Sequence, residues 1–319
     1  MNFLHGLLTR MRTWRRRYQP LLQNRWLRLG LQIFILLFCA VYLIKSLQGI
    51  EKPEALLSGN YGLALAALVG TIGSTFLGAL NWWLVLLALG QAVPWRTAAR
   101  IHFQSTLAKY LPGYFWQLLG KAYMTRQAGS SLRNVGLALM VEMGIIYATG
   151  VAMMGLLVPG GMAQALGLQK ALPYLIAAAV LLLVAIPFVT RWLVKRLGAA
   201  GQPVAVDLRL LAASEVLVVV NWVLIGWYFW MLGNAITPVS IDQLNNFIFV
   251  LTTSFLIGFL VLVVPGSIGV REAIIVLLLG PALTNPLAVV IALLDRAVFI
   301  LSEVLSYLIF RAGEHFWKR

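Results

Sequence analysis

Charged side chains are scarce in this sequence. Asp, Glu, Lys and Arg together make up 11% of its 319 residues, whereas hydrophobic residues make up 61%. A soluble globular domain carries about a quarter charged residues. The chain therefore has too little polar surface to dissolve in water. This excludes the pair of soluble domains that its length alone would allow.

Cysteine and histidine are rarer still. With a single cysteine, Cys39, no disulfide can form within the chain, and cysteine usage gives no indication of the redox compartment. The three histidines, His5, His102 and His315, are too scattered to suggest a metal site. The sequence also lacks Gly-x-Ser-x-Gly, phosphate-loop and His-Glu-x-x-His motifs. We therefore expect no metal, no other cofactor and no enzymatic activity.

Acidic residues number only ten against 25 basic ones, which gives a net charge of +15. Such an excess can indicate nucleic-acid binding. Here, however, Lys and Arg flank apolar segments instead of forming a separate basic domain. This arrangement is typical of the cytoplasmic flanks of membrane spans, which touch anionic lipid headgroups. We expect membrane lipids as partners, and no nucleic acid.

Residues 1–26 are predicted to form a basic amphipathic segment on the cytoplasmic side. Arginines recur between Arg10 and Arg25, opposite apolar residues at helical spacing, which suits a helix lying in the headgroup plane. A disordered basic tail is the alternative. A cleaved signal peptide is disfavoured, because the charged stretch is long and no small-residue cleavage site follows the next apolar run.

Six apolar runs predict an all-α, polytopic membrane helix bundle that forms a single transmembrane domain over residues 27–311. A helix of about 20 residues crosses a hydrocarbon core of about 30 Å. Basic residues between the runs place both termini in the cytoplasm of a multi-pass protein in the cell (inner) membrane, with residues 312–319 as a short cytoplasmic tail. The predicted spans are residues 27–47, 61–89, 135–158, 171–189, 210–232 and 287–310.

Two further apolar segments, residues 98–123 and 246–280, are each interrupted by a Pro-Gly pair. Proline breaks a helix, and irregular backbone at membrane depth is tolerated only inside protein or beside a wet cavity. We expect two re-entrant hairpins that enter from opposite sides, as in an inverted repeat. The alternative makes residues 247–264 a full span. The predicted hairpin breaks are Pro112, Gly113, Pro265, Gly266 and Gly269.

Five acids lie inside apolar runs, although each costs about 2.5–3.5 kcal/mol at a bilayer centre. Adjacent residues point in different directions on a helix. Two adjacent pairs, Arg271-Glu272 and Asp295-Arg296, would therefore be neutralised by pairing Arg271 with Asp295 or Glu272 with Arg296. Such pairs either lock helices together, or the cations bind a phosphate while an acid exchanges protons. The acids expected to be proton-coupled are Glu142, Glu215 and Glu303. The buried acids are Glu142, Glu215, Glu272, Asp295 and Glu303.

The two Pro-Gly segments resemble the lysylphosphatidylglycerol synthase transmembrane (flippase-domain) family, including its stand-alone members. The similarity is seated on residues 109–121 and 265–273, and extends over residues 27–310. At Lys121 the family pattern often has arginine, so the charge is kept and the planar fork is lost. Members that synthesise aminoacyl lipids carry a large soluble domain after the membrane part. This chain ends nine residues after Phe310, so lysyl transfer is not expected.

The resemblance implies two re-entrant elements and movement of lipid between leaflets. We therefore predict a flippase for an anionic phospholipid or a lipid-linked glycan. The alternatives are an integral-membrane lipid-modifying transferase and a scaffold of a glycolipid-synthesis complex. Glycine-rich helix faces such as that of Gly70, Gly73 and Gly78 allow close packing, within the chain or between copies in an oligomer. The predicted substrate-binding residues are Arg271, Glu272, Arg296, Asp295, Lys121, Trp116 and Gln117.

Overall fold

The computed structural model describes Val41 and residues 59–110, 116–165, 167–198, 206–260, 267 and 269–316. Within these ranges the chain forms helices joined by short loops, and no strand is present. The predicted basic segment 1–26, most of the first predicted span and both Pro-Gly pairs (Pro112, Gly113, Pro265 and Gly266) lie outside the described residues. The all-α class is confirmed.

Five helices are long and apolar enough to cross a membrane, judged by length and composition. Four of them coincide with predicted spans. A further predicted span, residues 287–310, lies within α12 (Asn285–Phe316), a single helix of 32 residues. The five are α3 (Tyr61–Ala88), α6 (Leu132–Leu156), α8 (Leu172–Gly198), α9 (Leu208–Ile236) and α10 (Leu244–Leu260), the last extended by the 3-10 turn η2 (Ile241–Gln243).

Polar residues at the starts of three of these helices explain where the helices begin. The side chain of Asn60 accepts a hydrogen bond from the amide of Leu63, and that of Ser131 accepts one from Asn134. Asp207 accepts from the amides of Arg209 and Leu210. Each side chain satisfies amides that have no partner within the first helical turn.

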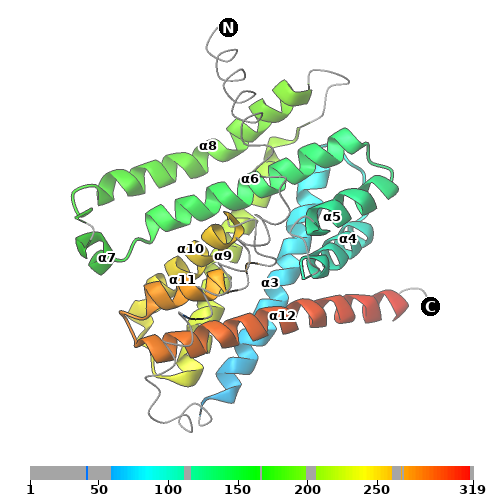
Figure 1. Cartoon of the computed structure of the whole chain (residues 1–319). Coiled ribbons are helices and arrows are strands. Elements are labelled where there is room, and N and C mark those ends of the chain that lie inside the picture. Colours follow the sequence, from blue (N-terminus) through cyan, green and yellow to red (C-terminus); the bar gives the residue numbers. More distant parts are fainter. Residues whose placement is uncertain are drawn as a thin grey trace.

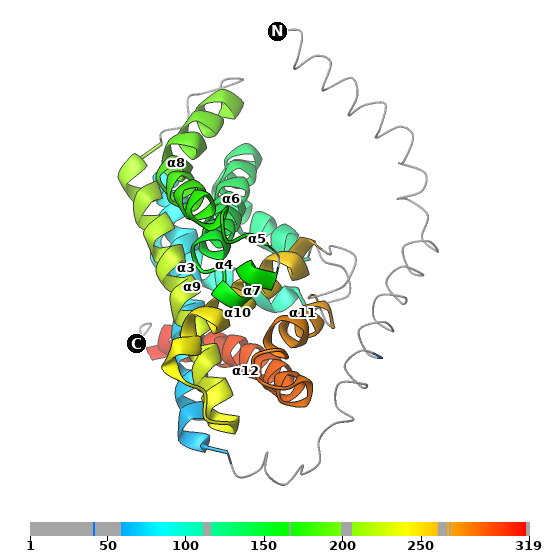
Figure 2. The ribbon, with the colours of Figure 1, turned by 90° about the vertical axis from the view of Figure 1, so that its left-hand side faces the viewer.

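Helices α3 and α9 pack along one face of the molecule, where they lie side by side (Figure 2). Glycine permits the close approach. A Cβ at Gly70 of α3 would lie 2.1 Å from the ring of Tyr228 on α9, and one at Gly226 would lie 2.5 Å from Ile248 on α10. Close packing is therefore confirmed at Gly70. A Cβ at Gly73 would meet no atom within 4 Å in the described structure beyond the neighbouring backbone of its own helix, so a role of Gly73 in oligomer contacts remains a prediction.

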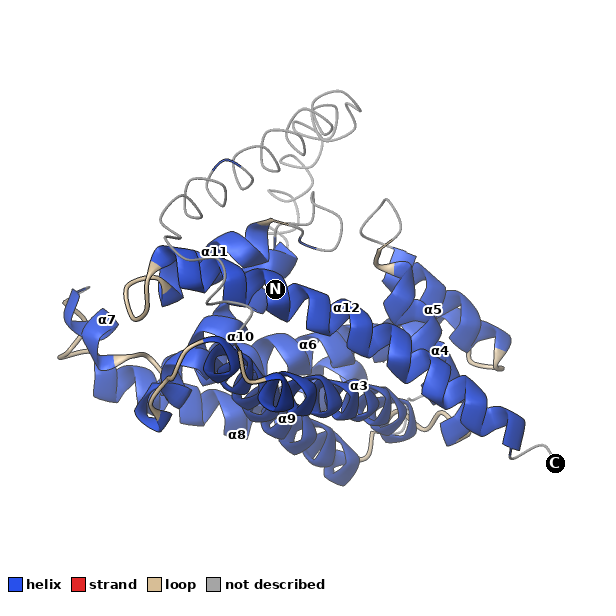
Figure 3. Ribbon diagram, turned by 90° about the horizontal axis from the view of Figure 1, so that it is seen from below, coloured by secondary structure: helices blue, strands red, loops and turns tan. Residues whose placement is uncertain are grey.

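The bundle also contains two helix hairpins, at the predicted positions in the sequence. The first consists of α4 (Trp95–Ala108) and α5 (Trp116–Gln127), and the second of α10 and α11 (Val270–Leu279). In each hairpin the two helices pack against each other, and α12 runs past both hairpins (Figure 1). Seen from below, α11 and the α4–α5 hairpin flank α12 toward its two ends (Figure 3).

Helix lengths separate α10 from the other hairpin helices. At about 1.5 Å per residue, α4, α5 and α11 are each shorter than about 22 Å, too short to cross a core of about 30 Å. Together with η2, α10 is 20 residues long and can cross it. Its length therefore fits the alternative of a full span, and the re-entrant arrangement remains a prediction.

Candidate functional site: a cationic cavity between the hairpins

A cavity of about 270 Å³, the central cavity, lies where both hairpins meet α6, α9 and α12. Each of these elements contributes to its wall, so the cavity brings together segments that are far apart in the sequence (Figure 1). It is lined by Lys109, Tyr110, Gln117, Met143, Ile146, Tyr147, Trp222, Ser254, Phe255, Leu256, Phe259, Ser267, Arg271, Arg296 and Phe299.

Among the described lining residues, three are cations and none is an acid. Lys109 directly follows α4, Arg271 lies in the first turn of α11, and Arg296 is near the middle of α12. The two hairpins and α12 therefore each supply one positive charge to the same cavity.

Each cation is paired with an acid outside the lining. Arg271 forms an ion pair with Asp295, and Arg296 lies 3.6 Å from a carboxylate oxygen of Glu272. Both of the predicted pairings between α11 and α12 are thus confirmed, and they coexist. Such pairing is required where a charge is buried away from water.

The guanidinium of Arg271 is clamped between two aromatic rings. Its Cζ atom lies 3.7 Å from the centroid of Phe255 and 4.4 Å from that of Phe299. Arg271 is only 4% exposed, yet its Nε has no hydrogen-bond partner among the described residues. A buried donor without a partner loses the full free energy of its hydration. The Nε–H group is therefore suited to an acceptor supplied by a ligand.

The third pair ties the first hairpin to α12. Lys109 donates to one carboxylate oxygen of Glu303, and the hydroxyl of Tyr110 donates to the other over 2.7 Å. Glu303 follows Asp295 by eight residues and so lies on the same face of α12 two turns further along. The acids of this face hold one cation from each hairpin.

Backbone geometry at the start of α11 fixes the position of Arg271. Gly269 adopts a φ of 82°, a left-handed conformation that glycine accepts without strain. Its amide donates to the carboxylate of Glu272 over 2.7 Å. The hydroxyl of Ser267 donates to the carbonyl of Gly258 on α10 over 2.6 Å, which joins the two helices of the hairpin. Gly269 thus starts α11, a role consistent with the predicted break.

The structure places Lys121 outside this cavity. Its Nζ lies 2.5 and 2.7 Å from the two carboxylate oxygens of Glu142 on α6 and 4.2 Å from the ring centroid of Trp82 on α3. Lys121 is buried and does not lie with Arg271 and Arg296, because α5 turns this face toward α3 and α6. Its part in substrate binding remains a prediction.

The other predicted site residues also divide into residues that line the cavity and residues that lie outside it. Gln117 lines the cavity, whereas Trp116 does not and is 48% exposed. Glu215 is buried in α9 outside the cavity and forms no hydrogen bond or ion pair within the described part of the chain. Sequence analysis missed Lys109 and Tyr110 as site residues, although both directly precede the first Pro-Gly pair.

Aromatic side chains form one wall of the cavity, the aromatic wall, and the sequence offers no way to predict which ones. Tyr147, Trp222, Phe255 and Phe299 sit in apolar helices, where aromatic residues are common on every face. Only the packing of the helices separates those that line the cavity from those that face lipid.

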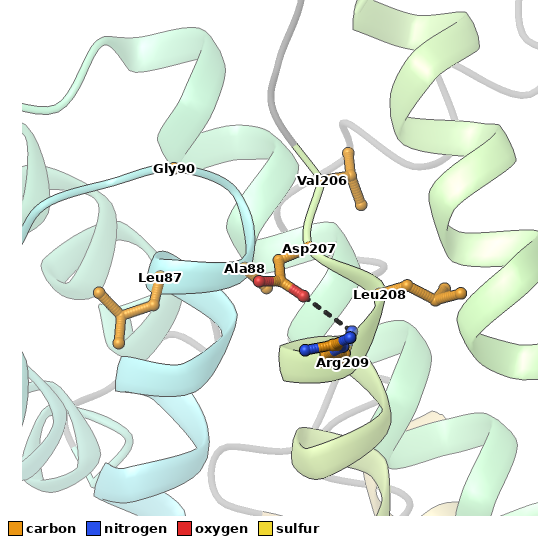
Figure 4. A pocket seen from close by; sticks show the side chains of 7 residues that line it. All are labelled: Leu87, Ala88, Gly90, Val206, Asp207, Leu208 and Arg209. Carbon is orange, nitrogen blue, oxygen red and sulfur yellow. Dashed lines mark hydrogen bonds between the residues drawn. The ribbon is translucent and has the colours of Figure 1, made fainter.

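A more open hollow of about 470 Å³ lies where the end of α3 meets the start of α9 (Figure 4). Its acid, Asp207, caps α9 by accepting from the amide of Arg209 over 2.8 Å. The amide of Asp207 also donates to the carbonyl of Ala88 over 2.9 Å. These contacts explain Asp207 by helix capping. In the described ranges, no group of three His, Cys, Asp or Glu side chains could hold a metal ion.

Comparison with known proteins gives one family. The family model described as the lysylphosphatidylglycerol synthase TM region matches residues 28–302, a range that contains both hairpins and the cavity. No curated protein matches the sequence. The match and the apolar helices together define a multi-pass membrane protein. The chain belongs to the family of the lysylphosphatidylglycerol synthase TM region.

Proposed function

We propose that this protein moves an anionic phospholipid between the leaflets of the cell membrane, with the headgroup passing through the central cavity. The observation that carries the proposal is the meeting of Lys109, Arg271 and Arg296 in one cavity between two helix hairpins. The Nε–H of Arg271, which has no hydrogen-bond partner among the described residues, supports it, because a phosphate oxygen is an acceptor of the kind this donor lacks there.

The volume of the cavity favours a small headgroup. Its volume of about 270 Å³ is near the lower end of ligand pockets, which run from about 300 to 1,000 Å³. A phosphodiester with a short polar substituent fits this volume better than a long glycan. The aromatic wall suits the glycerol backbone and the first carbons of the acyl chains, while the remaining chain stays in lipid.

The proposed orientation places both termini in the cytoplasm and rests on the basic residues between the apolar runs of the sequence. The two hairpins would enter the membrane from opposite sides and bring their cations to mid-depth, as in an inverted repeat. Transport would then use a lipid gradient, a proton gradient or the membrane potential.

The test is translocation by the full chain in proteoliposomes. Fluorescent phosphatidylglycerol is placed in both leaflets, and an impermeant reductant added outside destroys the label that becomes exposed. We expect the unaltered protein to expose inner-leaflet label and Arg271→Ala to reduce the signal to that of protein-free vesicles. Arg209→Ala is the matched control, since it removes an exposed arginine outside the central cavity.

Two results would contradict the proposal. One is equal transport by Arg271→Ala and the unaltered chain at equal protein content. The other is transport of phosphatidylcholine, which carries no net charge, at the same rate as phosphatidylglycerol.

A further inference from the structure

Among the described residues, the charges around the central cavity sum to zero. The three lining cations, Lys109, Arg271 and Arg296, are matched by three acids, Glu303, Asp295 and Glu272. A phosphodiester that enters this site adds one negative charge, and none of these described groups is left to compensate it. An uncompensated charge buried at membrane depth is strongly unfavourable. If the cavity binds an anionic headgroup as proposed above, the site needs one further positive charge.

A proton on one of the three acids would supply that charge. The acids differ in the hydrogen bonds and ion pairs that protonation would weaken. Glu303 accepts hydrogen bonds from both Lys109 and Tyr110. Glu272 accepts from the amide of Gly269 and faces Arg296. The hydrogen bond that Asp295 accepts comes from Arg271.

Arg271 is also the cation whose Nε lacks an acceptor in the described structure. When a phosphate draws the guanidinium toward itself, Asp295 loses its partner while it is only 3% exposed. A carboxylate in that position is more stable once protonated.

We propose that Asp295 is a proton-binding site, filled when an anionic headgroup takes Arg271. The proton comes from water and adds to a carboxylate oxygen of Asp295. The guanidinium N–H groups move from that carboxylate to a phosphate oxygen, and no other bond forms or breaks. One proton is taken up for each headgroup bound, so the occupied site returns to neutrality.

The surroundings of Asp295 are consistent with this exchange. It interacts electrostatically with two groups of α11 and one of its own helix. Helix α3 has no Asp, Glu, Lys, Arg or His. Helix α4 carries Arg96, Arg100 and His102 and is followed by Lys109, and none of the four is among the groups that act on Asp295. Arg100 and Lys109 pair with other acids of α12. None of the ionisable groups of α9 bonds to Asp295. The three groups that act on it are Arg271, Glu272 and Arg296.

The experiment measures proton uptake during lipid binding to the purified full chain. Short-chain phosphatidylglycerol is titrated into the protein in detergent, in a weakly buffered solution with a pH indicator. We expect uptake of about one proton per lipid and an affinity that tightens about tenfold for each unit of pH lowered. In Asp295→Asn, lipid should still bind, without uptake and with little dependence on pH.

One other acid serves as a control for the assignment. Glu215→Gln removes a buried acid that does not line the cavity, so this variant should keep the uptake of the unaltered chain. Loss of uptake in Glu215→Gln, or uptake retained in Asp295→Asn, would overturn the assignment to Asp295.

The measurement on the unaltered chain needs no variant to fold. If lipid binds without proton uptake and with equal affinity across pH, the inference is overturned while the proposed function stands. If phosphatidylglycerol does not bind at any pH, the proposed function fails and the inference fails with it.

Discussion

The two hairpins each carry a buried cation a few residues beyond a Pro-Gly pair, yet the two cations have different surroundings. Lys121 of the first hairpin contacts both carboxylate oxygens of Glu142 and stacks on Trp82. Arg271 of the second pairs with Asp295 but keeps a donor without a partner among the residues described. The first pair lies in packed protein and the second beside a cavity.

From this difference we propose that the first pair is structural and that the second takes part in binding. A cation whose partners are complete within the protein has nothing to offer a ligand. A cation beside a cavity can bind a ligand through a hydrogen-bond donor that lacks a partner within the protein. The contrast predicts that mutations at Lys121–Glu142 change stability most, and that mutations at Arg271 change transport most.

The largest expected effect is on stability, from Glu142→Ala. Removing this carboxylate leaves the Lys121 ammonium buried without its acid, which costs about 3–5 kcal/mol. We expect a much lower thermal midpoint in detergent and poor recovery from membranes. The double variant Lys121→Met, Glu142→Leu should recover most of the lost stability and retain lipid transport. Loss of transport in a stably folded double variant would show that this pair acts on lipid.

The second-largest effect is expected on transport, in the variant Arg271→Lys. The charge is kept, but the planar fork that suits a phosphate is lost. One charge-assisted hydrogen bond contributes about 1.5–3 kcal/mol, so we expect phosphatidylglycerol transport to fall about ten- to a hundredfold. Full activity of Arg271→Lys in the proteoliposome assay would mean that only charge matters here.

A double variant separates the two roles of Arg271. Arg271→Ala leaves Asp295 buried without its partner and should lower the thermal midpoint. Adding Asp295→Asn removes the uncompensated charge and should restore much of the stability, while transport stays absent. Recovery of transport in Arg271→Ala, Asp295→Asn would contradict a direct role for Arg271.

The smallest of these effects is expected from Tyr110→Phe. It removes one hydrogen bond to Glu303, worth about 0.5–1.5 kcal/mol, and leaves the Lys109 pair in place. We expect a small drop in thermal midpoint and a transport rate reduced by about threefold, within the range set by that energy. An effect as large as that of Arg271→Lys would mean that Tyr110 contacts the headgroup directly.

Local sequence rules were enough for the second hairpin. Adjacent opposite charges at Arg271-Glu272 and Asp295-Arg296 must point in different directions on their helices, so each needs a partner on the other helix. The same rule predicts both ion pairs from the sequence alone. The positions of α3, α6, α8 and α9 follow from hydropathy.

The remainder depends on packing that no local rule encodes. Nothing in the spacing of Lys121 and Glu142 indicates that they pair, because the rotation of α5 against α6 decides which faces meet. Lys109 and Tyr110 reach Glu303 only because α12 passes the end of α4. The aromatic wall likewise follows from helix rotation and not from composition.

The most direct test of the binding claim is a structure of the full chain in a lipid nanodisc that contains phosphatidylglycerol. The account predicts a headgroup in the central cavity, with a phosphate oxygen about 2.7–3.2 Å from a guanidinium nitrogen of Arg271. An acyl chain filling that cavity, or a headgroup held instead in the hollow beside Asp207 and Arg209, would contradict it.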